Sequence, residues 1–97
     1  MEMLKTGYFD KWLTSLRDGK ARMKIVRRIE QAEQGNFGDH KNVDGPVWEM
    51  RIDYGPGYRL YYAKKGETVY LLLCGGDKSS QQTDIRLALE IWRQIHG

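Results

Sequence analysis

Two arginines, Arg51 and Arg59, are the residues of this sequence best suited to chemistry. Both lie among tyrosines, in stretches where apolar and polar side chains alternate. A guanidinium group can hold two phosphate oxygens at once, and a tyrosine ring can stack on an unpaired base, so the pattern suits an RNA site. Spacing alone favours a plainer interpretation. In it, both arginines form cross-strand ion pairs with Glu49 and Asp53 on a solvated face.

The other reactive side chains are few. His40 lies in a segment of loop composition and could serve as a base, although a lone loop histidine is more often solvated. Cys74 is the single cysteine and lies in an apolar run, which indicates a buried structural thiol. Residues 75–78 are expected to end a strand, or alternatively to offer backbone N–H groups to a phosphate. The chain contains no common nucleotide-binding, metal-binding or catalytic motif, so we expect neither a metal nor a cofactor.

Length and charge restrict the kind of protein. The chain has 97 residues, which predicts one domain over residues 1–97. Its 16 Lys and Arg against 13 Asp and Glu give a net charge of +3, a modest preference for anionic partners. With one cysteine, no signal-peptide core and no apolar run long enough to span a membrane, the sequence predicts a cytoplasmic protein without membrane association.

Apolar residues at three- and four-residue spacing predict three helices. The first spans residues 8–16 and the second residues 20–34, and their short connection suggests an antiparallel helical hairpin. The third spans residues 80–95. Leu87 and Ile91 lie off its main apolar stripe, and a helix that is apolar on more than one side often meets two partners.

Between the second and third helices the periodicity changes to two. Residues 37–46 have loop composition, and strands are expected over residues 47–54, 58–64 and 68–74. A short strand at residues 3–5 has little support. The sequence therefore predicts an α+β fold, in which an N-terminal helical hairpin packs on a small antiparallel β-sheet and a C-terminal helix follows.

The turns predict which side chains share a face of the sheet. A three-residue loop at residues 55–57 would place Arg51 opposite Tyr61 and Asp53 opposite Arg59. A two-residue turn at residues 65–66 would then bring Tyr70 opposite Tyr61 on the same polar face. The other face is expected to receive the two N-terminal helices and to include Val69, Leu71 and Leu73.

Two long runs carry a family resemblance. Residues 48–62, WEMRIDYGPGYRLYY, resemble the central hairpin of the HigB-like killer proteins of the RelE/ParE toxin superfamily. Residues 71–81, LLLCGGDKSSQ, resemble the segment that follows this hairpin. The stretches FDKWL at residues 9–13 and RRI at residues 27–29 also fit. The resemblance covers almost the whole chain and implies a RelE/ParE-like α+β fold.

The resemblance also implies a function. HigB-like proteins are toxins of type II toxin–antitoxin systems, and their antitoxin in this branch is usually a helix-turn-helix DNA-binding protein. Their typical activity is ribosome-dependent cleavage of messenger RNA, in which the RNA 2′-hydroxyl attacks the adjacent phosphorus without a metal. ParE-like members of the superfamily are instead non-catalytic poisons of DNA gyrase, which is the alternative. A non-toxic binding module is a third possibility.

Site residues follow by position in the resemblance. Arg59 would stabilise the charge of the transition state, Arg51 would position the phosphate, and Lys78 would protonate the leaving oxygen. Tyr61 or Tyr70 would stack on a base. The strand histidines that some HigB proteins use are missing here, so the general base is open, with Asp77 and His40 as weak candidates.

The surface that contacts the antitoxin is predicted only from side chains that are expected to be exposed on the second and third helices. The second helix has a basic outer face, and the third helix carries apolar residues beyond its main stripe. The residues predicted to contact the antitoxin are Arg27, Arg28, Leu87 and Ile91.

Overall fold

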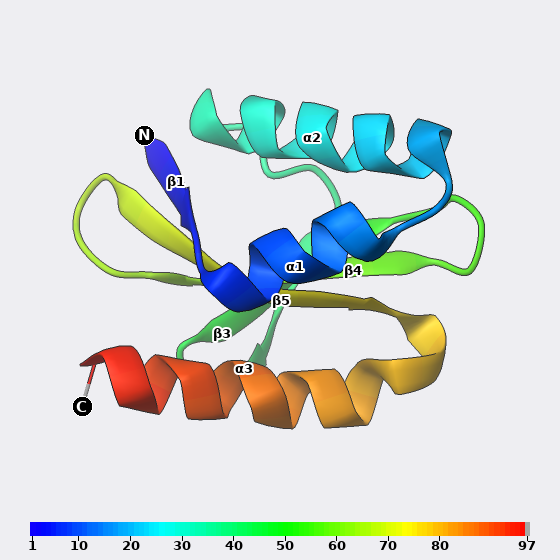
Figure 1. The fold of residues 1–97 in the computed structure, drawn as a ribbon. Helices are drawn as coiled ribbons and strands as arrows, with labels where there is room; N and C mark the ends of the chain where they lie inside the picture. The colour runs from blue at the N-terminus through cyan, green and yellow to red at the C-terminus, as the bar shows by residue number, and fades with distance from the viewer. Residues whose placement is uncertain (97) are drawn as a thin grey trace.

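In the computed structural model, which describes residues 1–96, a five-stranded sheet lies between helices on both of its faces (Figure 1). In chain order the elements are β1 (Glu2–Lys5), α1 (Gly7–Ser15), α2 (Gly19–Glu33), β2 (His40–Asp44), β3 (Val47–Ile52), β4 (Tyr58–Lys64), β5 (Val69–Asp77), the 3-10 turn η1 (Lys78–Ser80) and α3 (Gln81–His96). None of these helices is both long and apolar enough to cross a membrane.

The helices begin where the sequence provides capping side chains. Thr6 caps α1 by accepting a hydrogen bond from the N–H of Phe9, and Asp18 caps α2 by accepting from Lys20 and Ala21. Such caps satisfy N–H groups that have no partner within the helix. All three predicted helices are confirmed, with boundaries that differ by only a residue or so.

The strand order is β1-β5-β4-β3-β2. β1 runs parallel to β5, and the other neighbours are antiparallel, so the sheet is mixed rather than purely antiparallel as predicted. The predicted fold class is confirmed: two N-terminal helices, a small sheet and a C-terminal helix. Residues 40–44, expected to be loop, form the edge strand β2.

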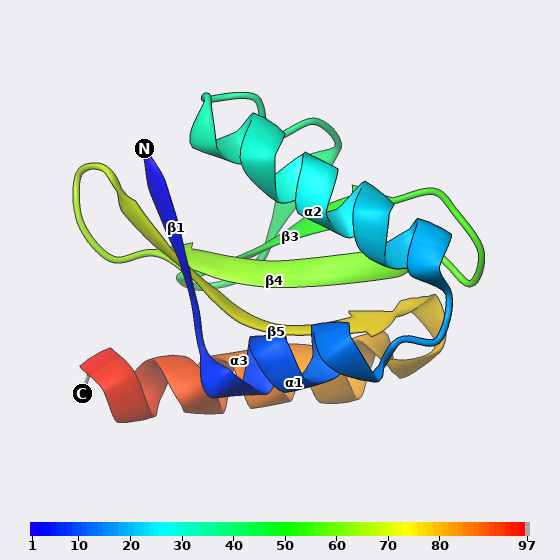
Figure 2. The same cartoon turned by 45° about the horizontal axis from the view of Figure 1, so that its top comes forward.

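Each face of the sheet has its own hydrophobic core. α1 and α2 pack on one face and α3 packs on the other. Figure 2 shows α2 and α3 on opposite sides of the sheet. The first core is centred on Phe9, Ile25 and Leu60, which have no exposed surface. The second packs Ala88 and Ile91 of α3 against the opposite side of β4 and β5.

The β3–β4 register differs from the prediction by two residues. Arg51 lies directly opposite Arg59, and Ile52 opposite Tyr58, so the connecting loop has five residues rather than three. Because side chains alternate with a period of two, this shift leaves every residue of the hairpin on its predicted face. Asp53 is the exception, since it lies in the loop and does not face Arg59.

The β4–β5 register also differs from the prediction, and here several residues of β5 change face. The backbone N–H of Lys65 bonds to Val69, which leaves three residues in the turn, and a bulge follows between Tyr61 and Tyr62. Tyr70 therefore lies opposite Lys64, on the face of α1 and α2, and not beside Tyr61. Leu71 and Leu73, predicted to face the N-terminal helices, pack against α3 instead.

A second correction concerns Gly75 and Gly76, which were expected to end β5. The strand continues through both glycines to Asp77. A Cβ at Gly75 would overlap the ring of Trp12 from α1, and a Cβ at Gly76 would overlap the carboxylate of Asp84 from α3. Glycine is needed here because both helices approach the strand backbone closely.

Candidate active site

Arg51 and Arg59 share the α3 face of the sheet with a buried carboxylate, that of Glu49. The Glu49 side chain has no exposed surface, and its two oxygens lie 3.8 Å from Arg51 Nε and 3.8 Å from Arg59 Nε. Gln81, at the start of α3, donates a hydrogen bond of 3.1 Å to Glu49 Oε1. The ion pairing foreseen with Glu49 thus exists, but around a buried carboxylate rather than on a solvated face, and the pairing foreseen with Asp53 is not found.

The two arginines differ in exposure and in their other partners. The Arg59 side chain is 13% exposed, whereas that of Arg51 is 33% exposed. Arg51 also pairs with Asp39, with 2.7 Å between Nη2 and Oδ1. This hydrogen bond is the main reason why the pKa of Asp39 lies below its usual value. Arg51 is therefore the outer and Arg59 the inner cation of one cluster.

Unmet hydrogen-bonding capacity is concentrated in this cluster. Among residues 1–96, four buried side-chain polar atoms make no hydrogen bond, and three of them are Glu49 Oε2, Arg59 Nε and the Tyr61 hydroxyl. Buried polar atoms are nearly always paired, so these three atoms keep the capacity for a further hydrogen bond. Arg51 is the guanidinium that solvent reaches more easily, and it is already paired with the carboxylates of Asp39 and Glu49.

The structure does not support stacking of a base on either predicted tyrosine at this cluster. The Tyr61 side chain is completely buried beneath α3, so neither face of its ring can receive a base. Burial, together with the Glu49 carboxylate, raises the pKa of its phenol. Tyr70 lies on the opposite face of the sheet, apart from Arg51 and Arg59.

Lys78 and Asp77 follow directly after the strand position that faces Arg59. Gly76 is paired with Arg59 across the sheet. Lys78 is exposed, and its Cβ would lie 3.5 Å from a Cβ added to Gly57. Lys78 is thus placed at the β3–β4 loop, at the rim of the site. The Asp77 carboxylate accepts hydrogen bonds from the backbone N–H and hydroxyl of Ser79, at 2.8 and 2.5 Å. These bonds lower its pKa, which makes Asp77 a poor base.

Comparison with known proteins gives the family. The family model described as phage derived protein Gp49-like (DUF891) matches residues 11–93. The chain belongs to the Gp49-like family. This is a toxin-like family related to the RelE/ParE superfamily. An uncharacterized protein of Haemophilus influenzae is 48% identical over 80 residues, which cover 82% of this chain and 81% of that protein.

The sequence pattern did not predict one carboxyl group near the two arginines, that of Asp84. Asp84 of α3 lies over Gly76, opposite Arg59, and accepts a hydrogen bond of 2.5 Å from Ser80. Burial raises its pKa, and the nearby charge of Asp77 adds to this effect, while the Ser80 bond opposes it. The available signal was the glycine pair in an otherwise bulky strand, which indicated a close approach by another group.

His40 is separated from the arginines of this Gp49-like chain by the sheet itself. Its ring lies 5.7 Å from that of Trp48 and 5.6 Å from that of Phe37, on the face that carries α1 and α2. The structure therefore does not place His40 as a base for the arginine site. Among the side chains that the structure describes, up to residue 95, no three of His, Cys, Asp or Glu are grouped closely enough to hold a metal ion.

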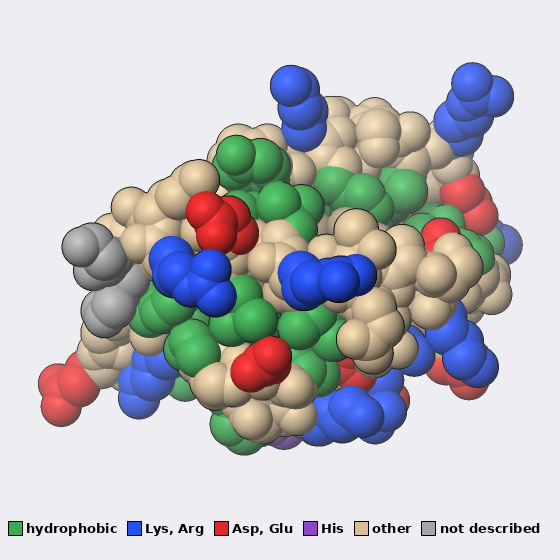
Figure 3. Space-filling view, turned by 90° about the horizontal axis from the view of Figure 1, so that it is seen from below, with side chains coloured by type: hydrophobic (Ala, Val, Ile, Leu, Met, Phe, Trp, Pro, Cys, Tyr) green, Lys and Arg blue, Asp and Glu red, His purple; other side chains and the backbone are tan. Residues whose placement is uncertain are grey.

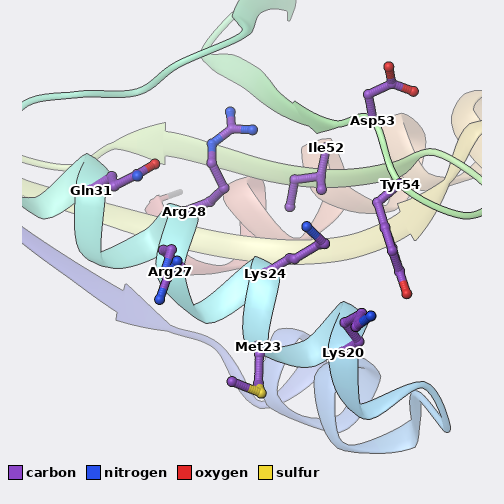
Figure 4. A pocket seen from close by; sticks show the side chains of 9 residues that line it. All are labelled: Lys20, Met23, Lys24, Arg27, Arg28, Gln31, Ile52, Asp53 and Tyr54. Carbon is purple, nitrogen blue, oxygen red and sulfur yellow. The ribbon is translucent and has the colours of Figure 1, made fainter.

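The residues predicted to contact an antitoxin have different surroundings. Arg27 is exposed and lines an open groove of about 580 Å³ between α2 and the end of β3 (Figure 4). Arg28 also lines it, but its guanidinium donates to the carbonyl oxygens of Arg51, Phe37 and Asp39 at 2.7, 2.9 and 3.2 Å. Burial lowers its pKa. Arg28 thus fixes the segment that leads into β2, which is a structural role.

The two α3 residues predicted to contact the antitoxin differ in how exposed they are. Ile91 is only 2% exposed and belongs to the core beneath α3, so its prediction as a surface contact is wrong. Leu87 is 37% exposed and stays available. Seen from the α3 side, hydrophobic side chains reach the surface between Lys and Arg side chains (Figure 3).

Proposed function

We propose that this protein is the toxin of a type II toxin–antitoxin pair and that it cleaves messenger RNA on the ribosome. Membership of a toxin-like family supports the first part of the proposal. The observation that carries the second part is the direct pairing of Arg51 with Arg59 across β3 and β4, around the buried carboxylate of Glu49. Two guanidinium groups on rigid strands suit a phosphate that gains charge in the transition state.

The proposed reaction is an internal transfer at one phosphate of the RNA. The 2′-hydroxyl oxygen attacks the adjacent phosphorus, the bond from phosphorus to the 5′ oxygen breaks, and a 2′,3′-cyclic phosphate and a 5′-hydroxyl result. Arg51, the more exposed arginine, positions the phosphate, and Arg59 stabilises its developing charge. Lys78 at the rim supplies the proton to the leaving 5′ oxygen.

Asp84 takes the role of general base in this proposal. It lies beside the strand position opposite Arg59, and its raised pKa makes its carboxylate a stronger base than an ordinary aspartate. Asp84→Asn keeps the size of the side chain and an oxygen that can accept from Ser80. We expect it to abolish cleavage while the protein stays folded, and unchanged cleavage would remove Asp84 from the mechanism.

The decisive experiment is brief expression without antitoxin, followed by mapping of 5′ ends on an abundant message. We expect new ends within translated codons, and none with an Arg51→Ala/Arg59→Ala double variant. Arg93→Ala is the matched control, because Arg93 is an exposed arginine on α3 outside the site and should leave cleavage intact. Arrested growth with intact messages and DNA breaks would instead indicate a gyrase poison, and normal growth would indicate a binding module.

The antitoxin partner is tested separately. Arg27 and Leu87 are the predicted contacts that remain exposed. If they touch the antitoxin, Arg27→Glu and Leu87→Asp should each weaken its co-purification with the toxin. Full recovery of the complex with both variants would place the antitoxin on another surface.

A further inference from the structure

An aromatic pocket lies on the sheet face opposite to the arginines. It has a volume of about 200 Å³ and is lined by Phe37, His40, Trp48, Tyr62, Lys64 and Tyr70. Within this lining the Phe37 ring stacks on that of Tyr62, with 5.4 Å between centroids and planes 23° apart. The Tyr70 ring lies 5.2 Å from Phe37 at 58°. Ring faces and edges are thus already ordered around the pocket.

The rim of this aromatic pocket is open to solvent and carries positive charge. Trp48 is 38% exposed, and His40 and Lys64 are also exposed. The Lys64 ammonium lies 5.9 Å from the centre of the Tyr70 ring, which orients it over the pocket. The lining contains a lysine and an imidazole but no carboxylate. Such a rim favours an anionic ligand.

We propose that the aromatic pocket binds one unpaired base of single-stranded RNA, with Lys64 on an adjacent phosphate. This inference rests on the proposed RNA-cleaving function and extends its substrate site to a second face of the protein. Bases that are not paired stack well on aromatic side chains, and every base has a flat face for this contact. The volume suits one ring system, and the cationic rim complements the phosphate that accompanies each base.

The edge strand β2 connects the aromatic pocket with the arginine site. Asp39, just before β2, pairs with Arg51 on the α3 face, while the next residue, His40, lies on the other face against Trp48. β2 is hydrogen-bonded to β3 only, so its outer edge is open. An RNA strand that passes around this edge can present one phosphate to Arg51 and a neighbouring base to the aromatic pocket.

The first test uses the full chain and a six-nucleotide single-stranded RNA, followed by the NMR signal of the Trp48 indole N–H. The signal is assigned by its loss in Trp48→Phe, because Trp12 and Trp92 give signals of their own. We expect RNA to shift this signal and an abasic strand of equal length to leave it in place. Equal responses to both strands, or no response to RNA, would overturn the proposal.

The second test compares matched variants by RNA affinity. Tyr70→Leu should weaken binding by roughly tenfold, the loss expected when one base no longer stacks, while Tyr8→Leu should not. Tyr8 is an exposed tyrosine of α1 that does not line the pocket. Lys64→Gln should reduce the salt dependence of binding by about one phosphate contact, and Lys65→Gln, its neighbour outside the pocket, should not. Equal affinities within both pairs would contradict the proposal.

The outcomes separate this inference from the proposed function. Cleavage at translated codons by a wild-type protein whose Trp48 signal ignores RNA would overturn the aromatic pocket alone. A base-dependent Trp48 shift without any cleavage would uphold the pocket and overturn the proposed nuclease. A shift produced by an acidic aromatic peptide but not by RNA would assign the pocket to a protein partner and overturn the inference.

Discussion

Replacing Glu49 by glutamine should destabilise the protein far more than the loss of one charge on its surface would. Glu49 has no exposed surface, and the Nε atom of Arg59, 3.8 Å away, is buried as well. At that separation two unit charges attract by roughly 4 kcal/mol if the effective dielectric constant is about 20. Removing one partner leaves the other guanidinium buried without its counter-charge, which typically costs about 3–5 kcal/mol.

The lower end of that range is expected for Glu49→Gln. The amide oxygen of glutamine can still accept the hydrogen bond that Gln81 donates, so only the charge is lost. A loss of about 3 kcal/mol would lower Tm by roughly 12–24 °C in a domain of this size. Urea unfolding at 25 °C gives the free energy directly, provided that the slope m is unchanged.

Glu90→Gln is the control that isolates burial. Glu90 pairs with Arg93 at 3.0 Å, a shorter contact than that of Glu49, but the two side chains are 54% and 71% exposed. Exposed pairs contribute about 0–1 kcal/mol, and salt screens them. If Glu49→Gln cost no more than Glu90→Gln, the view of Glu49 as the buried centre that holds the arginine cluster would be refuted.

Three further predictions test the surroundings of the site. Cys74 is buried and its pKa is raised to about 12 by burial, so alkylating reagents should modify it only after unfolding, and fast labelling of the native protein would contradict its burial. Gly76→Ala should lower Tm, because a Cβ there overlaps the Asp84 carboxylate, which must turn away from Ser80; a normal Tm would show that the Asp84 side chain can turn away without cost. Asp77→Ala should reduce the free energy of unfolding by about 1 kcal/mol near pH 6, through loss of its cap on η1. Because the folded-state pKa of Asp77 is lowered, its contribution is complete above the ordinary value of 3.8 and is lost as the pH falls through the folded pKa. The free energies of unfolding of the wild type and of Asp77→Ala, measured from pH 6 to pH 2, should therefore converge at low pH. A difference that stays constant with pH would contradict the role of the Asp77 carboxylate as a cap.

The helices and the central hairpin could be predicted because each has a strong local pattern. Apolar spacing defined α1, α2 and α3, and alternation defined β3 and β4. The grouping of Glu49, Arg51 and Arg59 survived an incorrect loop length because the register error was even. Local sequence therefore sufficed for the part of the site that lies on one hairpin.

The remainder depended on contacts that local patterns do not encode. β2 is an edge strand whose residues are mostly exposed, so it lacks the apolar alternation that identifies strands. β1 buries only Met3 and is defined by pairing with β5, far away in sequence. The turn before β5 has three residues rather than two, and the resulting odd register error moved Tyr70 to the other side of the sheet. The bulge between Tyr61 and Tyr62 then returns Cys74 to its predicted face.

The parallel pairing of β1 with β5 has a consequence for the order in which the sheet folds. Thr6, just after β1, donates a hydrogen bond of 2.6 Å to the carbonyl of Leu73, which is 67 residues away. β1 thus pairs with a segment far away in the sequence, and such contacts form slowly because a long loop must close first. The β3–β4 hairpin, which carries Glu49, Arg51 and Arg59, closes a loop of only five residues. We therefore expect the strands that carry the arginine cluster to pair early in folding and β1 to join the sheet late.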